Sequence, residues 1–294
     1  MDEPGFTRLA RCRVVIVGLG LMGGSLALAL RAAKAGREIW GVDSDPAALA
    51  FAVEQSIIDC AADFDSVLNC EFLILAAPVR AILSQLHRLT SVIRHAKRPS
   101  VTLLDLGSTK SKIVAAMEKL PPGFDPVGGH PMCGKEVSGI ENAEANLFRD
   151  KTFVLTPTKR ASSAALALAQ ELIAAIGARP LILSPERHDA LAAMSSHLPY
   201  VMAAALMRAA QTVDDDQLWT LAASGFRDTS RLAASDLTMM VDILLTNRAA
   251  ILDALGRYRT ELDWFITLIE AADPEALSAA LAPAQRKRAE LFRG

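Results

Sequence analysis

Short hydrophobic runs rich in β-branched residues alternate with helical segments over the first two thirds of the chain. The runs that predict strands are Arg13–Val17, Glu38–Val42, Phe72–Ala76, Val101–Leu106, Pro126–Gly129, Thr152–Leu155 and Pro180–Leu183. Helical composition follows at Leu26–Lys34, after the helix start Asp45-Pro46, and at Val79–Leu89, Lys110–Leu120 and Ser162–Ile176. This strand–helix–strand spacing predicts an α/β fold with a doubly wound, mostly parallel sheet.

Strand signals stop after Pro185, and the pattern from there to the end of the chain is helical. Apolar residues recur there at offsets of three and four, at Ile251, Leu255, Tyr258, Leu262, Phe265 and Ile269. We therefore expect a domain boundary near Ser184, with an α/β domain over residues 1–184 and an all-helical domain over 185–294.

One segment of the helical part, Ala190–Met207, carries no formal charge. A membrane-spanning helix needs about 20 strongly apolar residues, whereas this segment is largely alanine and includes Ser195, His197 and Pro199. We interpret it as a helix buried inside the protein or between subunits. Two helical halves packed together would hide such a surface, which favours a homodimer over a monomer whose helices cover its own sheet.

Charge and cysteine usage narrow the class of protein. The formal net charge is -2, without long basic runs, which argues against nucleic-acid or membrane-surface partners. The cysteines, at positions 12, 60, 70 and 133, show no C-x-x-C spacing and no His/Cys cluster, so no metal site is expected. Unpaired cysteines and an acidic start, Met1-Asp2-Glu3-Pro4, favour a cytoplasmic protein without a signal peptide.

The first chemical motif is Gly18-Leu19-Gly20-Leu21-Met22-Gly23, between a predicted strand and a predicted helix. In this setting glycines permit a tight turn, and the helix N-terminus offers N–H groups to a pyrophosphate. Asp43 ends the next strand, where a carboxylate accepts hydrogen bonds from ribose hydroxyls and repels a 2′-phosphate. A Rossmann-like domain that prefers NAD to NADP is therefore expected. The alternative role for Asp43, capping the following helix, suits Ser44 or Asp45 better.

Further candidate residues follow other strands. Open α/β sheets bind ligands beyond the carboxyl ends of their strands, and Ala77-Pro78, Gly107-Ser108-Thr109-Lys110 and Gly129-His130-Pro131 follow three of these ends. We expect a hydroxyl, a lysine and a histidine to lie beside a bound nicotinamide.

His130 is the candidate catalytic base. An imidazole with a pKa near 6.5 can accept a proton from a substrate hydroxyl as hydride leaves the same carbon. The flanking glycines and proline indicate a loop rather than a core. Cys133 is interpreted as a small packing residue, because hydride transfer needs no nucleophile.

Two segments of the helical part carry polar groups suited to a substrate. Arg227 and Arg231 are four apart, on one face of a predicted helix, and guanidinium groups suit carboxylates. A surface salt-bridge network with Asp228 and Asp236 is the alternative. The segment Ser195–Tyr200 is polar within an apolar helix, and its buried polar groups require either a core network or a ligand.

These motifs closely resemble one family, the prephenate/arogenate (cyclohexadienyl) dehydrogenases. The segments that carry the resemblance, in the family's order, are Gly-Leu-Gly-Leu-Met-Gly at 18–23, Asp-Leu-Gly-Ser-Thr-Lys at 105–110, Gly-Gly-His-Pro-Met at 128–132, Ser-His-Leu-Pro at 196–199 and Gly-Phe-Arg-Asp-Thr-Ser-Arg at 225–231. The similarity extends from about Arg13 to Ile269. It implies a modified Rossmann, dinucleotide-binding domain over 1–184 and a helical dimerisation and substrate-binding domain over 185–294.

The resemblance also implies an activity and roles for residues. The activity is oxidative decarboxylation of prephenate or arogenate, with hydride transfer to NAD, in tyrosine biosynthesis. His130 matches the catalytic histidine that polarises the ring 4-hydroxyl, and Ser108 matches the serine that hydrogen-bonds this hydroxyl and the nicotinamide region. Arg231 matches the arginine that binds a substrate carboxylate, and Ser196 and His197 match active-site helix residues.

This sequence departs from the family's pattern at two positions. Cys133 replaces a usual alanine, and Tyr200 stands where members that prefer prephenate often carry histidine. Tyr200 therefore weakens the case for prephenate over arogenate. Two other functions are weighed: a β-hydroxyacid dehydrogenase, which would share only the glycine motif and has a catalytic lysine with no obvious counterpart here, and a non-catalytic NAD-sensing module, which would need neither His130 nor Ser108.

Overall fold

A computed structural model describes residues 8–92, 101–135 and 137–292. The strands are β1 Arg13–Val17, β2 Glu38–Val42, β3 Cys60–Ala61, β4 Phe72–Leu75, β5 Val101–Asp105, β6 Phe124–Pro131, β7 Thr152–Pro157 and β8 Arg179–Ile182. They form one sheet in the order β3-β2-β1-β4-β5-β6-β7-β8. Every neighbouring pair is parallel except β6 and β7, which are antiparallel. The predicted doubly wound, mostly parallel sheet is confirmed.

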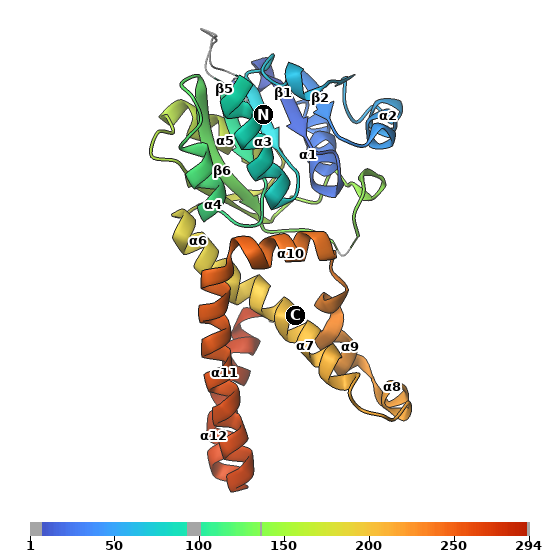
Figure 1. The fold of residues 1–294 in the computed structure, drawn as a ribbon, viewed down its shortest axis with the longest axis vertical. Coiled ribbons are helices and arrows are strands. Elements are labelled where there is room, and N and C mark those ends of the chain that lie inside the picture. Colours follow the sequence, from blue (N-terminus) through green and yellow to red (C-terminus); the bar gives the residue numbers. More distant parts are fainter. Residues whose placement is uncertain (1–7, 93–100, 136, 293–294) are drawn as a thin grey trace, which may run out of the picture. The chain divides into compact units, whose positions relative to one another are not determined.

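Helices lie on both faces of this sheet (Figure 1). They are α1 Leu21–Ala32, α2 Pro46–Glu54, α3 Val79–Val92, α4 Ser111–Met117 and α5 Ser163–Ala175. Because side chains alternate along a strand, Val14 and Ile16 of β1 enter one core with α1 and α5. Val15 and Val17 enter a second core with α3 and α4. The continuous apolar runs in the sequence reflect these two buried faces.

Two local expectations were wrong. The helix after the glycine motif begins at Leu21 rather than Leu26, because Gly20 ends the turn and the helix starts inside the motif. It ends at Ala32, and Lys34 has a left-handed backbone with φ 50°. His130 lies within strand β6 rather than in a loop, because β7 pairs with it and places Val154 opposite His130.

Every described element after β8 is helical. The first of these are α6 Pro185–Ala192, a π-helical turn Ala193–His197, α7 Leu198–Ala210, α8 Gln217–Leu221, α9 Ser224–Ser230, a 3₁₀ turn η5 Arg231–Ala234 and α10 Leu237–Thr246. Then come α11 Arg248–Ala271 and α12 Pro274–Leu291. Internal contacts divide the chain into two compact units, Met1–Arg248 and Ala249–Gly294. The domain boundary near Ser184 stays a prediction, and the two compact units meet at a different place, after Arg248.

Among the described residues, one helical run, Pro185–Ala210, is apolar and long enough to cross a membrane by length and composition alone. Only 28% of an 18-residue apolar stretch of this run is buried within the chain. Burial inside the protein therefore does not account for most of this run, and burial between subunits stays a prediction.

Candidate active site

The turn between β1 and α1 brings the glycine motif against the end of β4. Gly18 has φ +98°, and a Cβ there would lie 2.7 Å from the carbonyl oxygen of Ala76. A Cβ on Gly23 would lie 1.8 Å from the carbonyl oxygen of Gly18, whereas one on Gly20 would meet open space. Gly18 and Gly23 thus allow close packing of the backbone. Gly20 leaves room above the N-terminus of α1, where an anion is stabilised.

Asp43 lies beside this turn, at the end of β2. Its carboxylate accepts hydrogen bonds from the backbone N–H of Leu19 at 2.6 Å and of Asp45 at 2.9 Å. Asp45, not Asp43, caps α2, as expected. A pocket of about 350 Å³ is lined by Gly20, Asp43, Phe51 and Ile140, among others. Asp43, which can accept ribose hydroxyls, and Gly20, at the open N-terminus of α1, therefore line the same pocket.

The ends of neighbouring strands lie along one rim of the sheet. The N–H of Ala76 donates to Val17 and that of Leu106 to Leu75, which joins the ends of β1, β4 and β5. Ala77 and Pro78 follow β4, and Ser108, partly exposed, follows β5. The predicted cofactor residues of the first turn therefore lie on the same rim as these segments.

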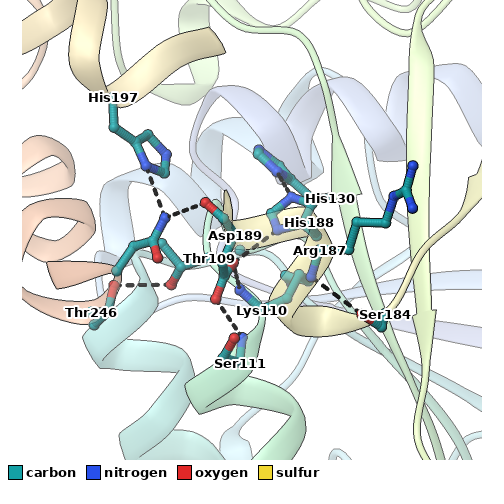
Figure 2. A network of polar contacts seen from close by, with 12 residues as sticks. Thr109, Lys110, Ser111, His130, Ser184, Arg187, His188, Asp189, His197 and Thr246 are labelled. Carbon is teal, nitrogen blue, oxygen red and sulfur yellow. Dashed lines mark hydrogen bonds and ion pairs between the residues drawn. The ribbon is translucent and has the colours of Figure 1, made fainter. Parts of the chain in front are cut away.

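His130 contacts a second histidine. Its Nδ1 lies 2.8 Å from Nε2 of His188 in α6, and the two rings meet edge to face (Figure 2). Nδ1 of His188 lies 2.9 Å from Oδ1 of Asp189. The Asp189 carboxylate also accepts the backbone N–H groups of Lys110 at 2.7 Å and Ser111 at 2.8 Å, where α4 begins. A chain of polar contacts thus runs from His130 to the N-terminus of α4.

Burial lowers the pKa of His130 well below its ordinary value, and the neighbouring His188, Lys110 and His197 lower this pKa further. The sequence-based expectation of an unperturbed value is therefore wrong. The residue as a whole is nevertheless partly exposed. At neutral pH the imidazole is neutral, which is the form that accepts a proton.

Lys110 does not face a ligand, contrary to expectation. Its side chain and that of Asp105 are completely buried and form an ion pair. The ammonium also donates to the carbonyl of Gly129 at 2.5 Å, and Asp105 accepts the N–H of Gly129 at 3.1 Å. Lys110 therefore fixes the backbone next to His130 from inside the protein.

His197 belongs to a core network rather than an open surface. It is 1% exposed, and its Nδ1 lies 3.2 Å from Nδ2 of Asn247, which also donates to the carbonyl of Asp189 at 2.8 Å. Burial lowers the pKa of His197 to about 4, despite the opposing effect of Asp189. The turn that carries it is π-helical, a distortion common at functional sites. Ser195 and Ser196 of the same turn are exposed.

The arginine pair does not share one α-helix. Arg227 is in α9, which ends at Ser230, and Arg231 begins the 3₁₀ turn η5. The side chain of Arg227 is 77% exposed and pairs with Asp228 at 3.2 Å, as the salt-bridge alternative predicted. Arg231 is also exposed. Both α9 and η5 pack against α7, the helix that carries Tyr200.

Three residues of the network were missed in the sequence: His188, Asp189 and Asn247. His188 and Asp189 stand among charged residues at the start of a helix, where exposure is the usual outcome. They are instead 2% and 4% exposed. The sequence contains no local signal for this, because their partners are 58 to 79 positions away.

The remaining candidates are less polar. Cys133 packs against the core of α1 and α5, and burial raises the pKa of its thiol to about 11, which supports a packing role. In the part of the chain that the structure describes, no group of three or more His, Cys, Asp or Glu side chains is arranged to hold a metal ion.

A glycine turn at a strand–helix junction, an acidic residue at the next strand end and a neutral histidine on the same rim define a nicotinamide-dependent dehydrogenase. Residues 26–182 match the family of prephenate dehydrogenase nucleotide-binding domains, and residues 184–283 match that of prephenate dehydrogenase dimerisation domains. The chain belongs to the prephenate dehydrogenase family, whose members are NAD-dependent oxidoreductases.

Individual relatives agree with this assignment. The chain is 37% identical to prephenate dehydrogenase of Bacillus subtilis over 90% of this chain and 72% of that protein. It is 29% identical to cyclohexadienyl dehydrogenase of Zymomonas mobilis over 95% of each. Prephenate dehydrogenase of Aquifex aeolicus, solved with hydroxyphenyl propionate and NAD+, superposes with a TM-score of 0.87 at 33% identity, covering 95% of this chain and 98% of that one. Arogenate dehydrogenase of Synechocystis gives 0.80 at 32% identity, covering 95% and 100%.

Proposed function

We propose that this chain oxidatively decarboxylates arogenate and prephenate with NAD, in the formation of tyrosine, and that His130 is the catalytic base. The observation that carries the proposal is a neutral His130 on the rim that also holds the glycine turn. The two rival functions lose support, because a β-hydroxyacid dehydrogenase or an NAD sensor would not need the other family motifs, and these span both parts of the chain.

The residues around the first turn fit an NAD molecule. Asp43 would accept the ribose hydroxyls, and Gly18, Gly20 and Gly23 would let the pyrophosphate approach the N-terminus of α1. Leu21 and Met22 begin that helix, and Ala77-Pro78 would line the nicotinamide side. When bound, the coenzyme supplies a hydride acceptor.

His130 would accept the proton of the substrate's ring hydroxyl while hydride leaves the carbon that carries it. The hydroxyl becomes a ketone, and the bond from the ring to its carboxylate then breaks. Its electron pair passes through the ring to the ketone oxygen, CO₂ departs, and this oxygen recovers the proton from His130 as the ring becomes aromatic. Ser108 would hydrogen-bond the reacting oxygen.

Residues of the helical part would hold the rest of the substrate. Arg231 would bind a carboxylate, a charge-assisted contact worth about 1.5–3 kcal/mol, and Arg227, which pairs with Asp228, is a second candidate. Ser196 and Tyr200 would line the site, and His197 would support it from within through Asn247 and Asp189.

The decisive experiment follows absorbance at 340 nm with NAD and prephenate or arogenate, each also with NADP. Turnover of at least one of the two substrates is expected. If a β-hydroxyacid is oxidised while both ring substrates are not, the proposed function is wrong.

We extend the proposal to assembly and location. The part after Ser184 would form a homodimer, supported by its match to dimerisation domains and by the exposed apolar side chains Leu191 and Met194 within Pro185–Ala210. The four cysteines are free, which agrees with a cytoplasmic enzyme.

A further inference from the structure

We infer that His188 and Asp189 are positioning residues that fix the tautomer of His130, so that its Nε2 can accept the substrate proton. The inference rests on the proposed role of His130 as base. It starts from the three aligned groups in Figure 2: His130 Nδ1 at 2.8 Å from His188 Nε2, and His188 Nδ1 at 2.9 Å from Asp189 Oδ1.

The direction of each hydrogen bond follows from Asp189. A carboxylate is an acceptor, so Nδ1 of His188 must carry a proton and donate it. In the neutral form of His188, which has only one N–H, Nε2 is therefore an acceptor. Nδ1 of His130 must then be the donor in the contact between the two rings. Nε2 of His130 is consequently without a proton, which is the form needed to accept one from a substrate hydroxyl.

Several hydrogen bonds hold Asp189 in place, so its carboxylate can determine the direction of the hydrogen bonds from His188 and His130. Its two carboxylate oxygens accept the N–H groups of Lys110 and Ser111 at the N-terminus of α4, and its carbonyl accepts Asn247. These donors keep the carboxylate ionised: hydrogen bonds from His188 and Ser111 lower the pKa of Asp189 against the effect of its burial. His188 itself is 2% exposed, so water does not compete strongly for its ring nitrogens.

The same hydrogen bonds can be kept when His130 is protonated. When the substrate proton reaches Nε2, His130 becomes an imidazolium with protons on both nitrogens, and Nδ1–H still donates to His188. The positive charge then lies one ring away from the Asp189 carboxylate. Lys110, the nearest buried cation, is already paired with Asp105. No second proton has to move, and the proton returns from Nε2 to the ring oxygen of the product.

The alternative is that His188 merely packs β6 against α6. His188→Leu removes the acceptor at similar size, and His188→Gln restores an acceptor near the position of Nε2. We expect His188→Leu to lower kcat by about 10²-fold or more, the order of effect of a wrong histidine tautomer or lost base. KM of His188→Leu should differ from that of the unmodified protein by less than about threefold. The kcat of His188→Gln should be about tenfold higher than that of His188→Leu. His87→Leu, on the exposed side of α3, is the matched control and should keep full activity.

A spectroscopic measurement separates tautomer from packing. The chain has five histidines, so ¹⁵N-histidine labelling gives few imidazole signals, and those absent from His130→Asn belong to His130. Nδ1 of His130 should be protonated in the unmodified protein, and the proton should shift towards Nε2 in His188→Leu. Circular dichroism and NAD titration check that each variant folds.

The outcomes are distinguishable. Absence of turnover with both ring substrates in the unmodified protein overturns the proposed function, while the tautomer measurement still decides the arrangement of the three groups. Turnover with full activity in His188→Leu, or a protonated Nε2 of His130 in the unmodified protein, overturns the inference. Should His188→Leu not fold, the unmodified spectrum and His188→Gln still decide.

Discussion

At the scale of single residues, Asp43 should set the choice of coenzyme. Its carboxylate is already oriented by Leu19 and Asp45, and a 2′-phosphate would bring a second negative charge against it. We expect kcat/KM to be higher with NAD than with NADP. Asp43→Ala should lower the ratio of kcat/KM with NAD to kcat/KM with NADP, because it removes both the acceptor for the ribose hydroxyls and the repulsion of the 2′-phosphate. A preference of the unmodified protein for NADP would refute this role.

His130→Asn should lower kcat by about 10²–10⁴-fold, the usual contribution of general acid–base catalysis. The substitution suits the site, because an asparagine amide can donate to His188 as Nδ1 does, whereas it has nothing in place of Nε2. Binding of NAD, followed by fluorescence titration, should be nearly unchanged. A variant that keeps more than half of the original kcat would remove His130 from the mechanism.

Tyr200 should make arogenate at least as good a substrate as prephenate. The two compounds differ at one side-chain position, a ketone in prephenate and an ammonium in arogenate. A cationic imidazole nearby would favour the additional net negative charge of prephenate, whereas a neutral tyrosine hydroxyl can accept a hydrogen bond from the ammonium. Tyr200 is only partly exposed, so a purely structural role is the competing explanation.

The test compares kcat/KM for both substrates in the unmodified protein and in Tyr200→His. The ratio should move towards prephenate in the variant. An unmodified protein that strongly prefers prephenate, or a ratio that does not move, would contradict this role for Tyr200.

At the scale of elements, the π-helical turn carries His197, whose protonation should make the folded protein less stable in acid. His197 has a pKa of about 4 when folded and about 6.5 when unfolded, so the unfolded chain binds the proton more tightly. Its contribution to stability is fully present above about pH 6.5 and is lost as the pH falls towards 4. Between pH 7 and pH 5 this loss should amount to about 2 kcal/mol.

Urea unfolding of the unmodified protein and of His197→Asn, at one protein concentration, measures this effect. Asparagine keeps an acceptor near the position of Nδ1 but does not titrate, so the variant should lose less stability between the two pH values. Equal losses in both proteins would mean that another group is responsible.

The elements also show where sequence-based prediction succeeds and fails. Every strand except β3 Cys60–Ala61, and the turn at Gly18–Gly23, were predictable because period, β-branched composition and glycine positions are local properties. The start of α1 was not, since it depends on the fit of Gly23 against Gly18. The extension of β6 through His130 depends on pairing with β7, and the inward turn of Lys110 depends on Asp105 and Gly129. These are tertiary contacts that no local pattern encodes.

At the scale of the whole molecule, the exposed apolar side chains within Pro185–Ala210, Leu191 and Met194 among them, should be covered by a second chain. Light scattering after size exclusion should give twice the 31.4 kDa of one chain. Leu191→Glu, at a position 50% exposed, should weaken the dimer, because burying an unpaired carboxylate is unfavourable. Val53→Glu, at a position 45% exposed on α2, is the matched control and should leave it intact. A monomer at all concentrations would contradict the proposal.

The buried pair of Lys110 and Asp105 has an evolutionary consequence. Removing one partner of a buried ion pair strands the other charge and costs about 3–5 kcal/mol, whereas replacing both by well-packed apolar residues is often neutral. Here the ammonium of Lys110 also donates to the carbonyl of Gly129, beside His130. A lineage that altered either position alone would pass through an unstable enzyme with a displaced base. A substitution at either position is therefore expected to be tolerated only when the partner position changes with it.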